Sequence, residues 1–291
     1  MTAGGEQVRV SQGMTEEIRG GRPFLVLSDV HLGAVPQATD RALLDFLDYA
    51  AEEAAGLVIG GDLFDVWLAS KHFVPRRYVR VLARLAEIAE GGILLYFVAG
   101  NRDVADWGGR VLQEDAGIRV LPDPARIRLG NRLALVAHGD GVRLGDAHGY
   151  RKPYGLLRNP VVIWAARHLL PTDWLFDILS RRSGTHVWVA RHARGEPTGP
   201  KARAPQIEEW ARAQLAKDPA LSLVVCGHSH LPALKEIERG RYYVNAGDWI
   251  SHYTYVLVPP ADAPPEVRRW PSRQLFDWRA LDDADAIKAP L

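Results

Sequence analysis

FLVLSDVHL, residues 24–32, joins four apolar residues to a polar turn that carries Asp29 and His31. The apolar part predicts a short buried strand, and the turn supplies a carboxylate and an imidazole two residues apart. Four similar blocks follow along the chain: GDLFD at 61–65, GNRD at 100–103, HGD at 138–140 and GHSH at 227–230. Apolar runs that predict strands precede three of these blocks, at 57–59, 93–98 and 221–226.

The spacing of apolar residues between these blocks predicts a layered α/β fold. Helical periodicity is present at 39–54 and 79–90, so strands and helices alternate along the chain. Loops at the carboxyl ends of strands in such sheets meet in one crevice, so the five blocks can lie together. Two predicted hairpins, at 127–136 and 234–244, indicate a second sheet packed on the first.

The same patterns divide the chain into four parts. We expect a disordered tail at 1–22, a core at 23–142 and 204–258, and an extension at 259–291 that packs on the core surface. An inserted cap at 143–203 contains predicted helices at 159–170 and 174–182. The cap holds eleven Lys or Arg and four Asp or Glu.

Composition excludes several classes of protein. The 291 residues are 47% hydrophobic and carry a net charge of +1, so no overall charge draws the chain to nucleic acid. Cys226 is the only cysteine, which excludes an internal disulfide and fits a reducing cytoplasm. No run resembles a signal peptide or a membrane span. We expect a cytoplasmic protein, and nothing in the sequence indicates an obligate protein partner.

The residue types of the blocks predict two divalent metal ions and the cleavage of a phosphoester or phosphoanhydride. Carboxylate, amide oxygen and imidazole suit Mn²⁺, the first expectation, and also Fe²⁺, Zn²⁺, Co²⁺ or Mg²⁺. Asp62, at the tip of a buried strand, is the natural ligand to bridge two ions. Asp29 and His31 can chelate one ion together, and a tight turn can let His228 and His230 serve different ions.

The order D-x-H, G-D, G-N-x, H-G and G-H-x-H resembles the calcineurin-like metallophosphoesterase family from about residue 24 to 258. The resemblance implies a four-layer α/β/β/α sandwich, here with the inserted helical cap. It also implies two ligand sets that share one aspartate. One set is Asp29, His31, Asp62 and His230; the other is Asp62, Asn101, His138 and His228.

Arg102 departs from that family, most of whose members have a histidine general acid at this position. Arginine keeps its proton near neutral pH, and a departing phosphate needs none, so Arg102 suits cleavage of a diphosphate. The alternative is a surface salt bridge from Arg102 to Asp103 or Asp106.

The GNRD block, the GDLFDVW stretch at 61–67 and the DAHGY stretch at 146–150 resemble the UDP-2,3-diacylglucosamine diphosphatases of lipid A biosynthesis. The resemblance implies cleavage to UMP and 2,3-diacylglucosamine 1-phosphate at the cytoplasmic face of the inner membrane. Asn101, Arg102 and His138 are then catalytic. The expected substrate contacts are Arg102, Asp146, Tyr150, Trp164, Trp174, Lys201 and Arg203.

Apolar residues at helical spacing in the cap, among them Trp164 and Trp174, fit either a lipid-gripping, membrane-resting lid or ordinary packing on the core. The alternative enzyme is a phosphodiesterase or phosphatase that acts on nucleotides or other soluble phosphates. The alternative without catalysis is a metal-stabilised interaction module. Asp65 and Asp103 are expected to hold the ligand loops by hydrogen bonds.

Overall fold

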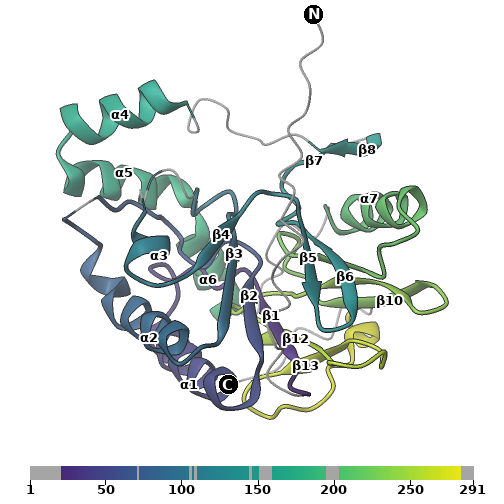
Figure 1. Cartoon of the computed structure of the whole chain (residues 1–291). Coiled ribbons are helices and arrows are strands. Elements are labelled where there is room, and N and C mark those ends of the chain that lie inside the picture. Colours follow the sequence, from purple (N-terminus) through teal and green to yellow (C-terminus); the bar gives the residue numbers. More distant parts are fainter. Residues whose placement is uncertain are drawn as a thin grey trace, which may run out of the picture.

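The strand Phe24–Leu27 (β1) lies inside a six-stranded sheet (Figure 1). The computed structural model describes residues 21–70, 72–104, 107, 110–143, 146–150, 159–194 and 203–282. The sheet has the order β13-β12-β1-β2-β3-β4, in which β1 to β4 are parallel and β12 is antiparallel to β1. The other strands of this sheet are β2 (Gly56–Ile59), β3 (Leu94–Val98), β4 (Arg119–Leu121), β12 (Thr254–Val258) and β13 (Glu266–Arg269).

A second, five-stranded sheet packs on the first. Its order is β10-β11-β9-β6-β5, with β6, β9 and β11 parallel and the two edge strands antiparallel to their neighbours. The strands are β5 (Ala125–Leu129), β6 (Arg132–Val136), β9 (Leu223–Cys226), β10 (Ala233–Glu238) and β11 (Arg241–Asn245). The two hairpins predicted from the sequence are therefore confirmed.

Strand alternation builds the layers. In β1, Phe24 and Val26 pack between the two sheets, whereas Leu25 and Leu27 pack on the opposite face. That opposite face is covered by α1 (Gln37–Glu53), α2 (Val79–Glu90) and α3 (Val111–Glu114), and a 3₁₀ turn at Arg76–Tyr78 leads into α2. The predicted helices at 39–54 and 79–90 correspond to α1 and α2.

The fourth layer is α7 (Ala204–Lys217), which covers the outer face of the second sheet. Trp210 and Leu215 of α7 pack against Val224 of β9 and Tyr243 of β11. The α/β/β/α sandwich expected from the sequence is thereby confirmed, and Figure 1 shows its helices on opposite sides of the two sheets.

The segment between the fourth and fifth blocks contains a short hairpin and a group of helices. The hairpin pairs β7 (Val142–Arg143) with β8 (Asp146–Tyr150). The helices are α4 (Pro160–Leu169), α5 (Thr172–Ser183) and α6 (Thr185–Ala193), and α6 is a helix that the sequence patterns did not predict. Among the described residues, no helix has the length and apolar character needed to cross a membrane.

The chain after residue 259 contains a strand that the sequence patterns did not predict. Residues Glu266–Arg269 form β13, an edge strand antiparallel to β12, and Val267 and Trp270 are buried in the core. A 3₁₀ turn at Trp278–Asp282 follows. Both sheet pairing and core packing thus continue beyond the boundary predicted at 258.

We expect Phe46→Ala in α1 to lower the free energy of unfolding by about 4 kcal/mol, the usual range for a buried phenylalanine. Phe46 is fully buried, and its ring contacts Trp249, Tyr255 and Trp270 at centroid distances of 5.1–5.4 Å. Urea unfolding measures the loss. Asp45→Ala, on the exposed face of the same helix, is the control and should change stability by less than about 0.5 kcal/mol. Equal effects of the two variants would contradict this account.

Candidate metal centre

The seven predicted ligands come together at the carboxyl ends of strands from both sheets. Asp29 and His31 follow β1, Asp62 follows β2 and Asn101 follows β3, while His138 follows β6 and the two remaining histidines follow β9. Asp29, His31, Asp62, His138 and His230 are buried, and Asn101 and His228 are half-buried. Parallel strands thus gather residues up to 201 positions apart at one place.

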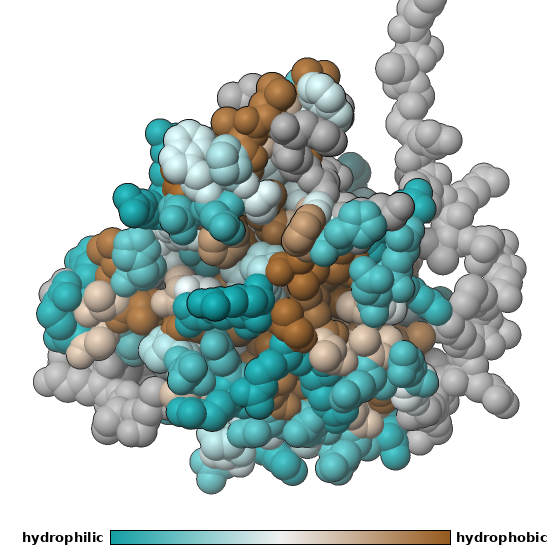
Figure 2. Space-filling model, turned by 90° about the vertical axis from the view of Figure 1, so that its left-hand side faces the viewer, coloured by the Kyte–Doolittle hydropathy of each residue, from teal (hydrophilic) through white to brown (hydrophobic). Residues whose placement is uncertain are grey.

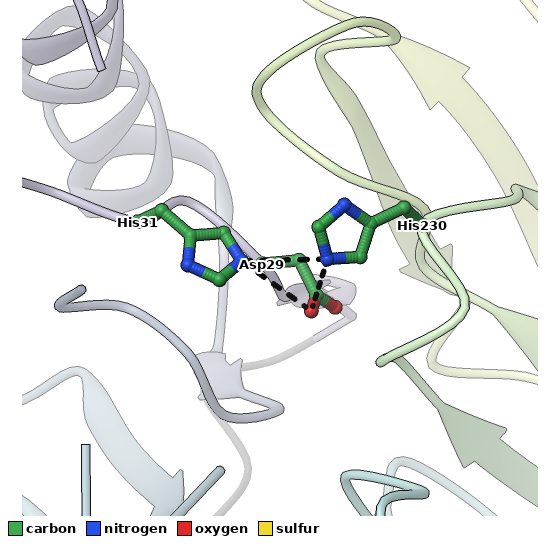
Figure 3. Close-up of side chains that lie close together, drawn as sticks. All are labelled: Asp29, His31 and His230. Atoms are coloured by element: carbon green, nitrogen blue, oxygen red, sulfur yellow. Dashed lines mark hydrogen bonds and ion pairs between the residues drawn. The ribbon is translucent and has the colours of Figure 1, made fainter. Parts of the chain in front are cut away.

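One group of ligand atoms consists of Asp29, His31 and His230 (Figure 3). The Nε2 atom of His230 lies 3.3 Å from Oδ1 of Asp29, and the Nε2 atom of His31 lies 3.9 Å from the same oxygen. The two Nε2 atoms are 3.4 Å apart. Three ligand atoms therefore face one small volume.

A second group surrounds His138. Its Nε2 lies 3.5 Å from Oδ2 of Asp62 and 3.3 Å from Oδ1 of Asn101. The ring of His228 stands nearly edge-on to the ring of His138, with centroids 5.1 Å apart. These are the residues that the family resemblance assigned to the second ion.

Asp62 lies between the two groups. Its Oδ2 atom is 3.8 Å from Nε2 of His31 and 3.5 Å from Nε2 of His138. Its other oxygen, Oδ1, accepts a hydrogen bond from the backbone N–H of Arg102. One carboxylate oxygen thus faces both groups, as the predicted bridging role requires.

Outer contacts orient three of the imidazoles in the way that metal-binding histidines require. Nδ1 of His138 lies 3.0 Å from the carbonyl oxygen of Gly60, and Nδ1 of His230 lies 3.3 Å from Asp248. Nδ1 of His31 lies 3.5 Å from Asp65. Each ring therefore turns Nδ1 toward an oxygen and Nε2 toward the centre. Because buried carboxylates also need a compensating cation, the residues fit a divalent metal site.

Charges within the centre shift the pKa values of its members in opposite directions. Burial disfavours the charged form of Asp62, but His138 and His31 outweigh it and hold the pKa of Asp62 far below its usual range. Burial opposes the protonation of His230, yet Asp29 and Asp248 raise its pKa to about 10. Burial and the charge on His138 lower the pKa of His228 to about 3. Without a cation, ionised carboxylates thus pair with protonated His138 and His230.

The backbone at the ligands is left-handed, a conformation that non-glycine residues rarely adopt. Positive φ angles of 53–64° occur at Asp29, His31, Asp62, His228 and His230. Two motif glycines are required by close approach: a Cβ at Gly100 would collide with Asp62, and a Cβ at Gly227 would collide with Ser28 and Asp29. Sharp turns packed against one another therefore bring the ligands together.

Acidic residues outside the ligand sets hold these turns. Asp103 accepts hydrogen bonds from the backbone N–H groups of Asp62, Phe64 and Gly100, which confirms its predicted structural role. Asp65 was also predicted to hold a ligand loop, and its carboxylate lies 3.5 Å from Nδ1 of His31. The supporting roles of Asp248 and Asp123 were not predicted. Asp248 follows the parallel strand β11, so a search for polar residues after the carboxyl ends of strands could have found it.

Two of the predicted substrate-binding residues, Tyr150 and Arg203, make hydrogen bonds within the protein. The Tyr150 hydroxyl donates to the Asp123 carboxylate at 2.7 Å, and Asp123 accepts from the backbone N–H of His138. Tyr150 thus supports His138 from behind, and this inward contact differs from the predicted contact with substrate. Arg203 donates to the carbonyl oxygen of Val142. Lys201 lies outside the described residues, and so does the side chain of Asp146. Asp106, the alternative salt-bridge partner of Arg102, also lies outside them.

The apolar residues of the cap divide between the two readings left open by the sequence. Ile163 and Leu175 are buried against Val66, Val104 and Trp107, so one side of α4 and α5 packs on the core loops. The other side stays exposed: Val161 and Leu169 at 70%, Trp164 at 56% and Trp174 at 54%. Figure 2 shows hydrophobic atoms at the top of the molecule, the level at which Figure 1 places α4.

Known proteins have sequences similar to that of this chain. The calcineurin-like phosphoesterase family matches residues 22–232. A UDP-2,3-diacylglucosamine hydrolase of Porphyromonas gingivalis is 31% identical over 79% of this chain and 91% of its own length. A hydrolase of the same name from Pseudomonas putida is 32% identical over 78% of this chain and 90% of its own length. Another, from Pseudomonas paraeruginosa, is 37% identical over 50% of this chain and 59% of its own length.

We expect Mn²⁺ binding to release protons at pH 7. The raised pKa values of His138 and His230 mean that both carry a proton at this pH in the metal-free protein. A metal ion needs the Nε2 lone pairs, so affinity should fall as the pH falls. Calorimetric titration at pH 7 in two buffers of different ionisation enthalpy measures the release, and His230→Ala should reduce it. Equal heats in both buffers would contradict the prediction.

Asp103→Ala should lower the free energy of unfolding by about 3 kcal/mol, because three buried N–H groups lose their acceptor. Asp103→Asn keeps one acceptor oxygen and should lose less. Chemical denaturation measures both variants. The control is Asp115→Ala, an exposed aspartate nearby, for which we expect almost no change. A stable Asp103→Ala protein would show that the hydrogen bonds do not hold the ligand turns.

Proposed function

Since this chain belongs to the calcineurin-like phosphoesterase family, we propose that it hydrolyses the diphosphate of UDP-2,3-diacylglucosamine to UMP and 2,3-diacylglucosamine 1-phosphate. The observation that carries the proposal is the convergence of all seven predicted ligands beside an arginine, Arg102, in place of a general acid. The names of the relatives, which share about a third of the chain's residues over most of its length, supply the substrate.

In this proposal the chain holds two divalent ions, with Mn²⁺ the expected metal. Asp29, His31, Asp62 and His230 hold one, and Asp62, Asn101, His138 and His228 hold the other. Two such ions supply a nucleophile from water at neutral pH and neutralise charge on the phosphate. The protein fixes the ligands in position through the left-handed turns and the outer carboxylates.

Arg102 acts on the diphosphate. An arginine does not donate its proton near neutral pH, so Arg102 neutralises negative charge on the departing phosphate and does not act as a general acid. The second pKa of a phosphate monoester is about 6, and such a group leaves without protonation. Asp103 is one of the two alternative salt-bridge partners of Arg102. Its carboxylate accepts three backbone hydrogen bonds.

The exposed side of the cap is proposed to hold the acyl chains and to rest on the cytoplasmic face of the inner membrane. Trp164 and Trp174 offer large apolar surfaces there, and Arg181 and Arg182 at the end of α5 are exposed cations. Apolar side chains beside exposed arginines match the requirements of an anionic lipid surface. Asp146, Lys201 and Arg203 remain proposed contacts of the substrate.

The test is Mn²⁺-dependent release of UMP from UDP-2,3-diacylglucosamine in detergent, beside bis-p-nitrophenyl phosphate as a soluble diester. We expect rapid UMP release that falls about a hundredfold in Arg102→Ala, the usual cost of removing a group that stabilises transition-state charge. Arg110→Ala, a well-exposed arginine nearby, is the matched control and should keep full activity.

Three outcomes separate the alternatives. Cleavage of the diester alone would replace the lipid substrate with a soluble phosphate or nucleotide. Absence of any turnover would favour a metal-stabilised interaction module. Turnover that survives in Asp62→Ala and His228→Ala would instead remove the proposed two-metal mechanism.

A further inference from the structure

Helix α6 (Thr185–Ala193) lies against the metal centre. The indole of Trp188, near the middle of this helix, stands edge-on to the ring of His230, with centroids 5.6 Å apart and planes at 85°. The guanidinium carbon of Arg102 lies 5.9 Å from the centroid of the same indole. Trp188 therefore contacts both a predicted metal ligand and the arginine proposed to act on the diphosphate.

Both ends of α6 are also connected to the surroundings of the ligands. At its start, the buried Thr185 and the last residue of α5, Ser183, lie beside Asp65, the residue next to Nδ1 of His31. At its end, Nδ1 of His192 lies 3.2 Å from Oγ of Ser251. The backbone N–H of Ser251 in turn donates to Asp248, which faces Nδ1 of His230. These contacts give the Trp188 ring a defined position.

Arg102 needs such a contact. Its backbone N–H is fixed by Asp62, but several rotatable bonds separate the backbone from the guanidinium. The Asp103 carboxylate is occupied by three backbone N–H groups and lies fully buried. An aromatic face within about 6 Å attracts a guanidinium and limits where it can lie.

We propose that Trp188 is the positioning residue of Arg102. The indole face holds the guanidinium over the metal centre, so that Arg102 meets the diphosphate without first being ordered by it. The inference rests on the proposed function for the role of Arg102, but the contact between the two side chains can be tested independently of turnover.

Activity measurements give the first test. Trp188→Leu should lower kcat for UMP release about tenfold with little change in KM, because the charge is misplaced in the transition state. Trp188→Phe keeps an aromatic face and should retain most of the activity. His186→Ala, an exposed residue of the same helix, is the matched control and should behave as wild type.

A double-mutant cycle then assigns the effect to Arg102. In an Arg102→Ala background, Trp188→Leu should cause almost no further loss, because its effect passes through the missing guanidinium. Independent, multiplying losses would overturn the proposal. So would a rise in KM with unchanged kcat, which would make Trp188 a wall of the substrate site.

A spectroscopic readout needs neither substrate nor metal. In protein labelled with 5-fluorotryptophan, the ¹⁹F resonance that disappears in Trp188→Phe belongs to Trp188. We expect this resonance to shift in Arg102→Ala and to stay in place in Arg110→Ala. An unmoved resonance would refute the contact even if Trp188→Leu failed to fold. Absence of UMP release by the wild type would instead refute the proposed function and leave this result standing.

Discussion

The Asp29 carboxylate connects the two sheets, and the metal centre depends on that connection. Its Oδ2 atom accepts hydrogen bonds from the hydroxyl of Ser28, in the turn after β1, and from the backbone N–H of His228, in the turn after β9. Its backbone carbonyl accepts from the N–H of Trp249, beyond β11. The other carboxylate oxygen faces His31 and His230. Asp29 thus connects the carboxyl ends of strands from both sheets. It also contributes a predicted ligand atom where the two sheets meet.

Most of the sandwich could be predicted because its strands are short apolar runs that end in recognisable turns. The strands at 24–27, 57–59 and 221–226 and the helices at 39–54 and 79–90 were predicted within a few residues of their observed ends. Helix α6 was not, because it begins with Thr185 after the left-handed Gly184 and contains the β-branched Val187, all poor helix signals. Strand β13 was missed because prolines surround it, and its pairing with β12 depends on tertiary context.

The sequence predicted which seven side chains come together at the centre, but it did not predict most of the residues that support them. Asp and His in short glycine-bounded blocks stand out in a sequence, and the structure brings all seven together. The residues behind them carry no such signal: Tyr150 looked like a substrate contact, but its hydroxyl holds Asp123 behind His138. Likewise, nothing in the sequence separates Trp188 from Trp164 and Trp174, since only tertiary packing turns one indole inward and leaves the other two exposed.

The left-handed backbone at the predicted ligands costs free energy that a bound cation can offset. Each such residue costs about 1 kcal/mol or more, and the chain regains this free energy whenever the turns open locally. An ion that binds the closed turns alone opposes opening, and its stabilising effect grows with ion concentration. A divalent cation that binds the closed turns would therefore lower how often the ligand loops open. When divalent ions are scarce, we expect these loops to open more often to proteases and to amide exchange.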